Sequence, residues 1–297
     1  MSHQAKPDPD RTRRAAAEKA DPLAVIAGGG ALPLAVADAA RASGREVYLI
    51  GIRGEATDAI ERFPHAWLKW GEVGKLFTTL EDRRCRDLVI IGSVSRPDLA
   101  NIRFDLGAIR NLPRLLRLGI GGDDNVLSTL VRFLEGKGYR VLGAGDVAPG
   151  LLAGEGQLGA KAPSEADRVD IAVAFRVVAA LGRLDVGQGA VVVNKRVLAV
   201  EAAEGTDAML SRCAELRGGS QRRNLGGVLL KAPKPGQEER VDLPTIGPET
   251  VQKAAEAGLA GIAVAARRVL IAERDATVAT ADRLGLFLIG QTLPPDA

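Results

Sequence analysis

Short aliphatic runs alternate with helical patterns over the first half of the chain, and this alternation constrains the fold more than any other feature. Residues 23–27 form an aliphatic run that ends in three glycines, and an Ala/Leu/Val-rich helical pattern follows. Further apolar strands are expected at residues 46–51, 87–92 and 139–143. Because strands joined by helices usually pair in parallel through right-handed crossovers, residues 21–152 are predicted to form a Rossmann-like, doubly wound parallel sheet.

The composition changes between residues 148 and 166 to glycine, proline, alanine and isolated charges, and we place a domain boundary there. Beyond it, residues 189–200 indicate a β-hairpin that turns at Asn194 and Lys195. For residues 163–292 we expect a second α/β domain with a mixed sheet. Its other strands are expected at 227–231, 261–265, 269–272 and 286–289, and its helices at 164–181, 206–216, 248–257 and 276–284.

The first twenty residues carry five lysines and arginines among alanine, aspartate and proline, and are predicted to be a disordered tail. Contact of this tail with anionic lipid is the less favoured alternative. The formal net charge of the whole chain is only +3, and no nucleic-acid partner is expected. No apolar run approaches the ~18 residues of a membrane span, and no secretory signal is visible, so a cytoplasmic location is expected.

Histidine and cysteine are too scarce to form a cluster. Cys85 and Cys213 stand far apart in the sequence, as do His3 and His65, so neither a disulfide framework nor a thiolate metal site is predicted. If the protein is an enzyme, its acid, base and metal ligands are therefore mainly carboxylates. Such ligands favour hard ions such as Mg²⁺.

The glycine run 28–30, followed by Ala31, lies where a dinucleotide-binding fold has its pyrophosphate loop. Position 33 is proline instead of the third glycine, and no acidic residue closes the second strand, which continues into Arg53. An NAD site is therefore not expected. A contact from Gly30 and Ala31 to a nucleotide or sugar phosphate and a purely structural turn both remain open.

Two other segments of the first domain could contact an anionic ligand. Ser93, Ser95 and Arg96 follow the strand at 87–92, where they could bind an anion or serve a capping role. Gly74 and Lys75 belong to the segment 71–75, a loop that leads into the start of the helix expected at 73–85, and this segment lacks the spacing of a phosphate-binding P-loop.

Asp123 and Asp124 precede the helix expected at 126–137 and could bind a metal, although capping of that helix is the commoner role. Residues 111–118 place leucines and arginines on different helical faces. That pattern suits an ordinary half-buried helix or, less commonly, a lipid surface.

In the second domain, Glu201, Glu204 and Asp207 crowd around one strand-to-helix turn. Crowded carboxylates need a metal, a lysine or a substrate, unless they point to water and Thr206 caps the helix.

Farther along, Asp242 precedes a rigid Leu-Pro-Thr turn. The preceding segment, Lys-Ala-Pro-Lys-Pro at 231–235, adds two lysines, and Arg240 adds a guanidinium. Cations beside a fixed carboxylate indicate phosphate-ester chemistry.

Several motifs together resemble one family, the LpxI-type UDP-2,3-diacylglucosamine pyrophosphatases. The resemblance extends from residue 23 to residue 290, and its two C-terminal motifs, Lys-Ala-Pro-Lys-Pro and Asp-Leu-Pro-Thr-Ile-Gly, are the specific ones. The other motifs are Ile-Ala-Gly-Gly-Gly-Ala-Leu-Pro at 26–33, Val-Ser-Arg-Pro at 94–97, Gly-Gln-Gly-Ala-Val at 187–191 and the segment 197–210.

The resemblance implies a Mg²⁺-dependent hydrolase of lipid A biosynthesis. Such an enzyme cleaves UDP-2,3-diacylglucosamine to UMP and 2,3-diacylglucosamine 1-phosphate, called lipid X, by attack of water on the sugar-side phosphorus. The resemblance also implies two domains that clasp the ligand, with the acyl chains held mainly by the C-terminal half. It further implies peripheral contact with lipid at the inner face of the inner membrane, and it admits a homodimer.

The resemblance makes Asp242 the essential catalytic residue, either as a magnesium ligand or as the group that orients the water. Glu204 and Asp207 are candidate co-ligands, and Lys231, Lys234 and Arg240 are candidate partners of phosphate charge. The full set of expected substrate-binding residues is Gly30, Ala31, Gly74, Lys75, Ser95, Arg96, Asp124, Gln188, Thr206, Lys231, Lys234, Thr245 and Gly247.

Two rival functions remain at this point. One is a non-catalytic sugar-nucleotide or lipid-binding protein in which Asp242 merely caps the helix that begins near Pro248. The other is a NAD-dependent oxidoreductase.

Overall fold

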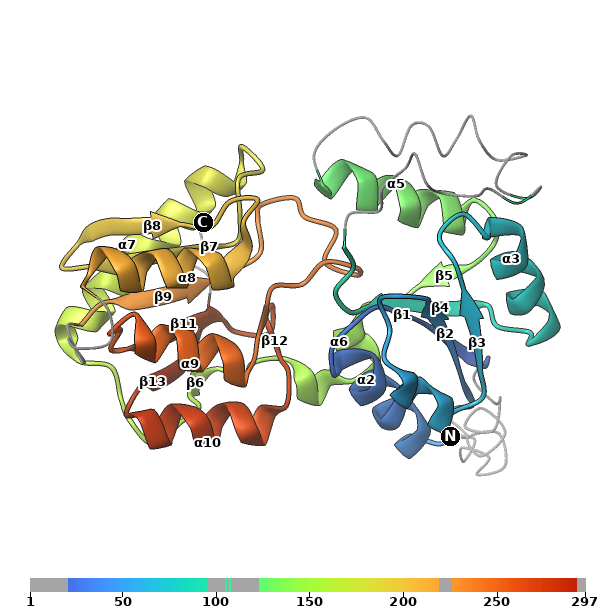
Figure 1. The fold of residues 1–297 in the computed structure, drawn as a ribbon, viewed down its shortest axis with the longest axis horizontal. Helices are drawn as coiled ribbons and strands as arrows, with labels where there is room; N and C mark the ends of the chain where they lie inside the picture. Colours follow the sequence, from blue (N-terminus) through green and yellow to red (C-terminus); the bar gives the residue numbers. More distant parts are fainter. Residues whose placement is uncertain (1–20, 96–104, 106, 108–122, 219–225, 293–297) are drawn as a thin grey trace, which may run out of the picture.

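A computed structural model describes residues 21–95, 105, 107, 123–218 and 226–292. Two α/β bodies lie side by side, each built around its own sheet (Figure 1). Three predictions concern residues outside this described part: the disordered tail at 1–20, the anion-binding Arg96, and the helix at 111–118.

The first body contains a five-stranded sheet in the order β3-β2-β1-β4-β5. All four neighbouring pairs are parallel, and β1 at the centre pairs with both β2 and β4. This confirms the predicted parallel sheet. The strands are β1 (Leu23–Ala27), β2 (Val47–Ile52), β3 (His65–Leu68), β4 (Asp87–Ile91) and β5 (Arg140–Val141).

Helices cover both faces of this sheet, as expected for a doubly wound fold. Successive residues of β1 point to opposite faces: Leu23 and Val25 pack with one set of helices, and Ala24 packs with the other set. The first set is α2 (Leu32–Ala42), η1 (Asp58–Arg62) and α6 (Ala144–Val147), and the second is α3 (Val73–Asp82) and α5 (Asp123–Glu135).

Two details of this body differ from the sequence prediction. Strand β3 was not predicted, because it is a short edge strand that follows Pro64 and is mostly only half-buried. Helix α5 begins at Asp123, so Asp124 lies within its first turn instead of in a cap before it.

The second body contains a six-stranded sheet in the order β6-β13-β11-β9-β7-β8. The central pairs are parallel, whereas β6, β7 and β8 each pair antiparallel with their neighbours, which confirms the predicted mixed sheet. The strands are β6 (Gly156–Gln157), β7 (Gly189–Val193), β8 (Arg196–Val200), β9 (Val228–Lys231), β11 (Gly261–Ala265) and β13 (Phe287–Gln291).

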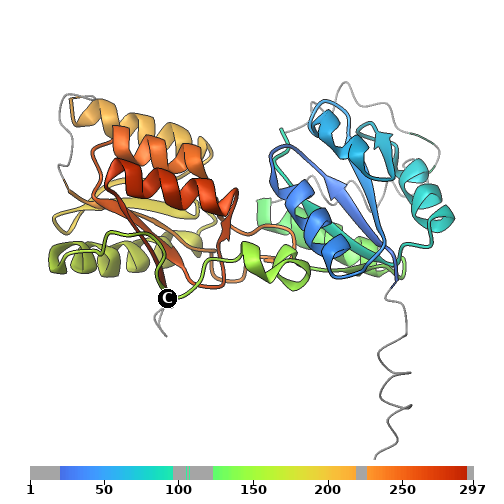
Figure 2. The ribbon, with the colours of Figure 1, turned by 90° about the horizontal axis from the view of Figure 1, so that it is seen from below.

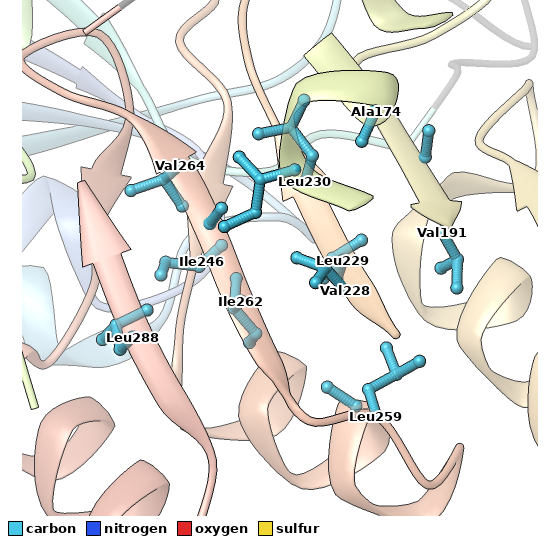
Figure 3. Close-up of a cluster of buried hydrophobic side chains, with 14 of the residues drawn as sticks. Ala174, Val191, Val228, Leu229, Leu230, Ile246, Leu259, Ile262, Val264 and Leu288 are labelled. Carbon is cyan, nitrogen blue, oxygen red and sulfur yellow. The ribbon is translucent and has the colours of Figure 1, made fainter. Parts of the chain in front are cut away.

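Helix α7 (Glu165–Gly182) lies on one face of the second sheet, and three helices lie on the other (Figure 2). Because both faces are covered, the central strands are apolar over most of their length, as Leu229 and Leu230 of β9 show (Figure 3). The three helices are α8 (Gly205–Leu216), α9 (Pro248–Glu256) and α10 (Arg274–Leu284).

The segment between β9 and α9 carries the specific C-terminal motifs and crosses between the two bodies (Figure 1, orange). It ends in β10 (Thr245–Ile246), which pairs in parallel with β12 (Leu270–Ile271) to form a separate two-stranded sheet. A strand was expected at 269–272, and β12 confirms it, although it lies in this separate sheet and not in the six-stranded one. Leu270 instead packs into the core of the first body together with Leu243.

Candidate active site

A cavity of about 340 Å³ lies between the two bodies. Its first wall is the carboxyl edge of β1 and β4, the edge at which open α/β sheets usually bind ligands. Its second wall is the crossing segment and β12. Five of the candidate site residues line it, namely Gly30, Ala31, Arg240, Asp242 and Thr245.

The glycine run is both a tight structural turn and part of this cavity. Gly29 and Ser93 exchange backbone hydrogen bonds of 2.7 and 3.1 Å, which hold the run against the end of β4. A side chain at Gly28 would clash with the carbonyl oxygen of Ser93, and Gly30 has a φ of 86°. Both positions therefore require glycine. The loop lines the cavity just before α2 begins, where backbone N–H groups are available to an anion.

Two amide side chains hold Asp242 in the second wall. Gln188 donates a hydrogen bond of 3.0 Å to Oδ2 of Asp242, and Gln237 donates to the same oxygen and, at 2.6 Å, to the backbone carbonyl. Helix α9 has Gly247 as its N-cap, with no side-chain cap. Asp242 therefore does not cap α9, and the rival role considered for it is wrong.

A buried polar cluster lies next to Gln188. Lys231 donates a hydrogen bond of 2.6 Å to the hydroxyl of Thr206, and this hydroxyl donates one of 2.8 Å to Oε1 of Glu201. Nζ of Lys231 also lies 3.6 Å from Oε2 of Glu201, with side chains only 7% and 12% exposed. Because Gly189 pairs with Lys231 across β7 and β9, Gln188 and the cluster share one sheet edge.

The other two predicted metal ligands lie in a different environment. Glu204 forms an ion pair of 2.6 Å with Arg212, and Asp207 forms one of 2.9 Å with Lys253. The hydrogen bond from Lys253 to Asp207 is the main cause of a raised pKa of Lys253. Among the described residues, no three His, Cys, Asp or Glu side chains gather closely enough to hold a metal ion. The structure thus does not bring Asp242, Glu204 and Asp207 together, because cations of α8 and α9 hold the latter two.

The other two candidate phosphate cations also have carboxylate partners. Lys234 is paired with Asp185. Arg240 lines the cavity and binds Glu238, which raises the pKa of Arg240 and lowers that of Glu238. Arg240 also forms an ion pair of 2.6 Å with Glu135 of α5, and this pair connects the two bodies.

The remaining expected residues lie outside the cavity wall that the described residues form. The backbone of Lys75 donates a hydrogen bond of 3.1 Å to Asp105, beside Gly74. Ser95 donates one of 3.0 Å from its backbone to Glu55. Gly247 only begins α9.

Sequence analysis missed Gln237, which holds Asp242. It placed Ser93 at the carboxyl end of a strand and Glu201 among crowded carboxylates. The structure places Ser93 in the cavity wall and Glu201 in the buried cluster. Nothing in the sequence around Gln237 points to its hydrogen bonds.

Comparison with known proteins covers both bodies. Residues 22–151 match the LpxI N-terminal domain, and residues 154–289 match the LpxI C-terminal domain. The chain belongs to the LpxI family. It is 45% identical over 272 residues to the UDP-2,3-diacylglucosamine pyrophosphatase LpxI of Caulobacter vibrioides, and the aligned part covers 90% of this chain and 96% of that protein.

Family membership confirms the resemblance that the sequence motifs indicated, and it links the LpxI motifs to the geometry of the cavity. The glycine run belongs to the part that matches the LpxI N-terminal domain, and Asp242 belongs to the part that matches the C-terminal domain. No helix in the described part of this LpxI family member is long and apolar enough to cross a membrane.

Proposed function

We propose that the protein is a hydrolase that cleaves the pyrophosphate bond of UDP-2,3-diacylglucosamine and releases UMP and lipid X. The observation that carries this proposal is the position of Asp242, which two amides hold in a cavity wall opposite a glycine loop. The LpxI relative from Caulobacter vibrioides is named for the same substrate.

In the proposed reaction, the oxygen of water bonds to the sugar-side phosphorus, and the bridging oxygen leaves with UMP. Such phosphoryl transfers depend on positioning and on stabilisation of phosphate charge. The loop from Gly30 to Ala31 supplies backbone donors to a phosphate, and Arg240 supplies positive charge in the same cavity. Asp242 orients the water or accepts its proton, because the amides of Gln188 and Gln237 fix its orientation.

We propose that a magnesium ion would be held by Asp242 together with the phosphates of the substrate. Mg²⁺ is commonly held by one or two carboxylates together with substrate phosphates. The residues around the cavity fit that arrangement, whereas the three-carboxylate set including Glu204 and Asp207 does not fit it. When bound, the ion would neutralise phosphate charge.

The cellular location and the oligomeric state of the protein remain predictions. We infer a cytoplasmic protein that contacts lipid at the inner face of the inner membrane, because both acyl chains of the proposed substrate are anchored in lipid. Sedimentation with vesicles that contain UDP-2,3-diacylglucosamine tests this contact, and the molar mass in solution tests the homodimer.

The proposed function is tested by release of UMP from UDP-2,3-diacylglucosamine in detergent micelles. We expect turnover by the wild-type protein and a loss of about 10²- to 10⁴-fold in Asp242→Asn, since this variant keeps the size of the side chain but loses its charge. Asp275→Asn, an exposed change on α10, is the matched control and keeps its activity.

The same assay tests whether turnover depends on Mg²⁺. Chelation is expected to abolish turnover, and Mg²⁺ to restore it. Calorimetric titration with Mg²⁺ in the presence of substrate is expected to show binding to wild type and weaker binding to Asp242→Asn. A wild-type protein that binds the substrate without releasing UMP would instead be a binding module.

A further inference from the structure

Glu201 lies outside the wall of the cavity but occupies the centre of the buried cluster beside it. Its Oε1 accepts a hydrogen bond of 2.8 Å from Thr206, and its Oε2 is fully buried without a hydrogen-bond partner, 3.6 Å from Nζ of Lys231. A buried carboxylate is costly unless a nearby charge compensates it, and Lys231 is the cation that does so here. Glu201 likewise compensates the charge of Lys231, whose side chain is only 7% exposed.

Glu201 also packs against the segment that holds Asp242. A Cβ atom at Gly189 would lie 2.5 Å from Oε2 of Glu201, and a Cβ atom at Gly187 would clash with the carbonyl oxygen of Glu201. The backbone N–H of Glu201 donates a hydrogen bond of 2.9 Å to the carbonyl of Gly189. Glu201 is thus in contact with both neighbours of Gln188, the residue whose amide donates to Asp242.

We propose that Glu201 is a positioning residue of the hydrolase: it fixes the ammonium group of Lys231 and the hydroxyl of Thr206 beside Gln188, and it thereby supports the amide that donates to Asp242. This inference rests on the proposed function. The chain of contacts is continuous, since Lys231 and Thr206 are joined by a hydrogen bond of 2.6 Å and both reach Glu201.

The geometry excludes Glu201 from the role of general base in this arrangement. Both of its oxygens face Thr206 and Lys231, and the cavity wall formed by the described residues does not include it. Its neighbour Glu204 does not share the role, because Arg212 holds that carboxylate and leaves it 34% exposed.

The test is a double-mutant cycle measured by UMP release, with every variant first shown to be folded at the assay temperature by its thermal unfolding. The variants are Glu201→Gln, Lys231→Met and the double variant. Glu201→Gln keeps an oxygen for Thr206 but removes the charge that faces Lys231. Glu215→Gln is the matched control, because it makes the same change of charge at an exposed position of α8 and is expected to keep its activity.

We expect Glu201→Gln to lower kcat/KM by about 10- to 100-fold, the scale of a displaced catalytic contact. If Glu201 acts through Lys231, the double variant turns over at about the rate of Lys231→Met alone, because the second change removes nothing more. Losses that multiply would instead mean that Glu201 and Lys231 affect turnover independently of each other. In a Thr206→Val background, which serves if Lys231→Met is too slow to measure, Glu201→Gln is expected to cost less than in wild type.

Two outcomes overturn the inference while leaving the proposed function intact: an active Glu201→Gln, or losses that multiply in both backgrounds. Absence of UMP release from the wild-type protein overturns the proposed function itself. The two failures are therefore distinguishable in one experiment.

Discussion

Positions 187 and 189 are glycines because another residue occupies the space that a side chain would need there. Glu201 fills that space with its carbonyl oxygen at Gly187 and with its carboxylate at Gly189. The Gly-Gln-Gly motif therefore serves a packing purpose, and the functional group it presents is the amide of Gln188. Sequence analysis identified Gln188 from the resemblance, whereas the reason for its two glycines appeared only with the position of Glu201.

Alanine substitutions at these glycines are expected to differ in severity. Gly187→Ala meets backbone, which cannot easily move, so we expect it to cost about 3 kcal/mol of stability and most of the UMP release. Gly189→Ala meets the end of a side chain, so we expect about 1 kcal/mol and a smaller loss of activity. Thermal unfolding and UMP release measure both effects. Gly150→Ala is the control, since nothing lies within 4 Å of a Cβ atom there; equal effects at all three positions would contradict this explanation.

The β7–β8 hairpin shows how far an element could be predicted from its residues. Asn194 and Lys195 were predicted to form the turn, and both have left-handed backbones, with φ of 50° and 65°. Strands β10 and β12 show the limit. Each is two residues long, and their pairing depends on a contact between segments about 25 positions apart, which local periodicity does not report.

The same hairpin turn depends on a residue from α7. Asp170 is buried and accepts hydrogen bonds of 2.9 and 2.6 Å from the backbones of Asn194 and Lys195. Asp170→Ala is expected to lower the free energy of unfolding by about 1.5 to 3 kcal/mol, because hydrogen bonds to a charged group are lost. Urea denaturation measures this change. Glu165→Ala, an exposed change on the same helix, is expected to stay within about 0.5 kcal/mol of wild type; a similar loss in both variants would mean that Asp170 has no special role.

At the scale of the whole molecule, apolar packing connects the bodies more strongly than charge does. Leu270 is 3% exposed and belongs to the core of the first body, although β12 follows the second body's strand β11. The ion pair between Arg240 and Glu135 also spans the bodies, but both side chains are more than one third exposed. Exposed pairs contribute little to stability.

This contrast predicts opposite outcomes for two substitutions between the bodies. Leu270→Ala is expected to lower the free energy of unfolding by about 2 to 5 kcal/mol because it leaves a cavity in the core. Glu135→Gln is expected to change it by less than about 1 kcal/mol. Urea denaturation compares the two, and a larger effect of Glu135→Gln would show that charge, not packing, holds the bodies together.

The residues alone were enough to predict a parallel sheet followed by a mixed sheet, because aliphatic runs and helical patterns are local signals of burial. The domain limits 21–152 and 163–292 remain predictions of this kind. Motifs spread along the chain also identified the family and drew attention to Asp242. Only the tertiary structure decided which polar groups meet, separating Asp242 from Glu204 and Asp207 and joining Glu201 to Lys231. Hydrogen bonds and ion pairs act over a few ångströms, and the distance between two side chains in space is set by the packing of whole elements.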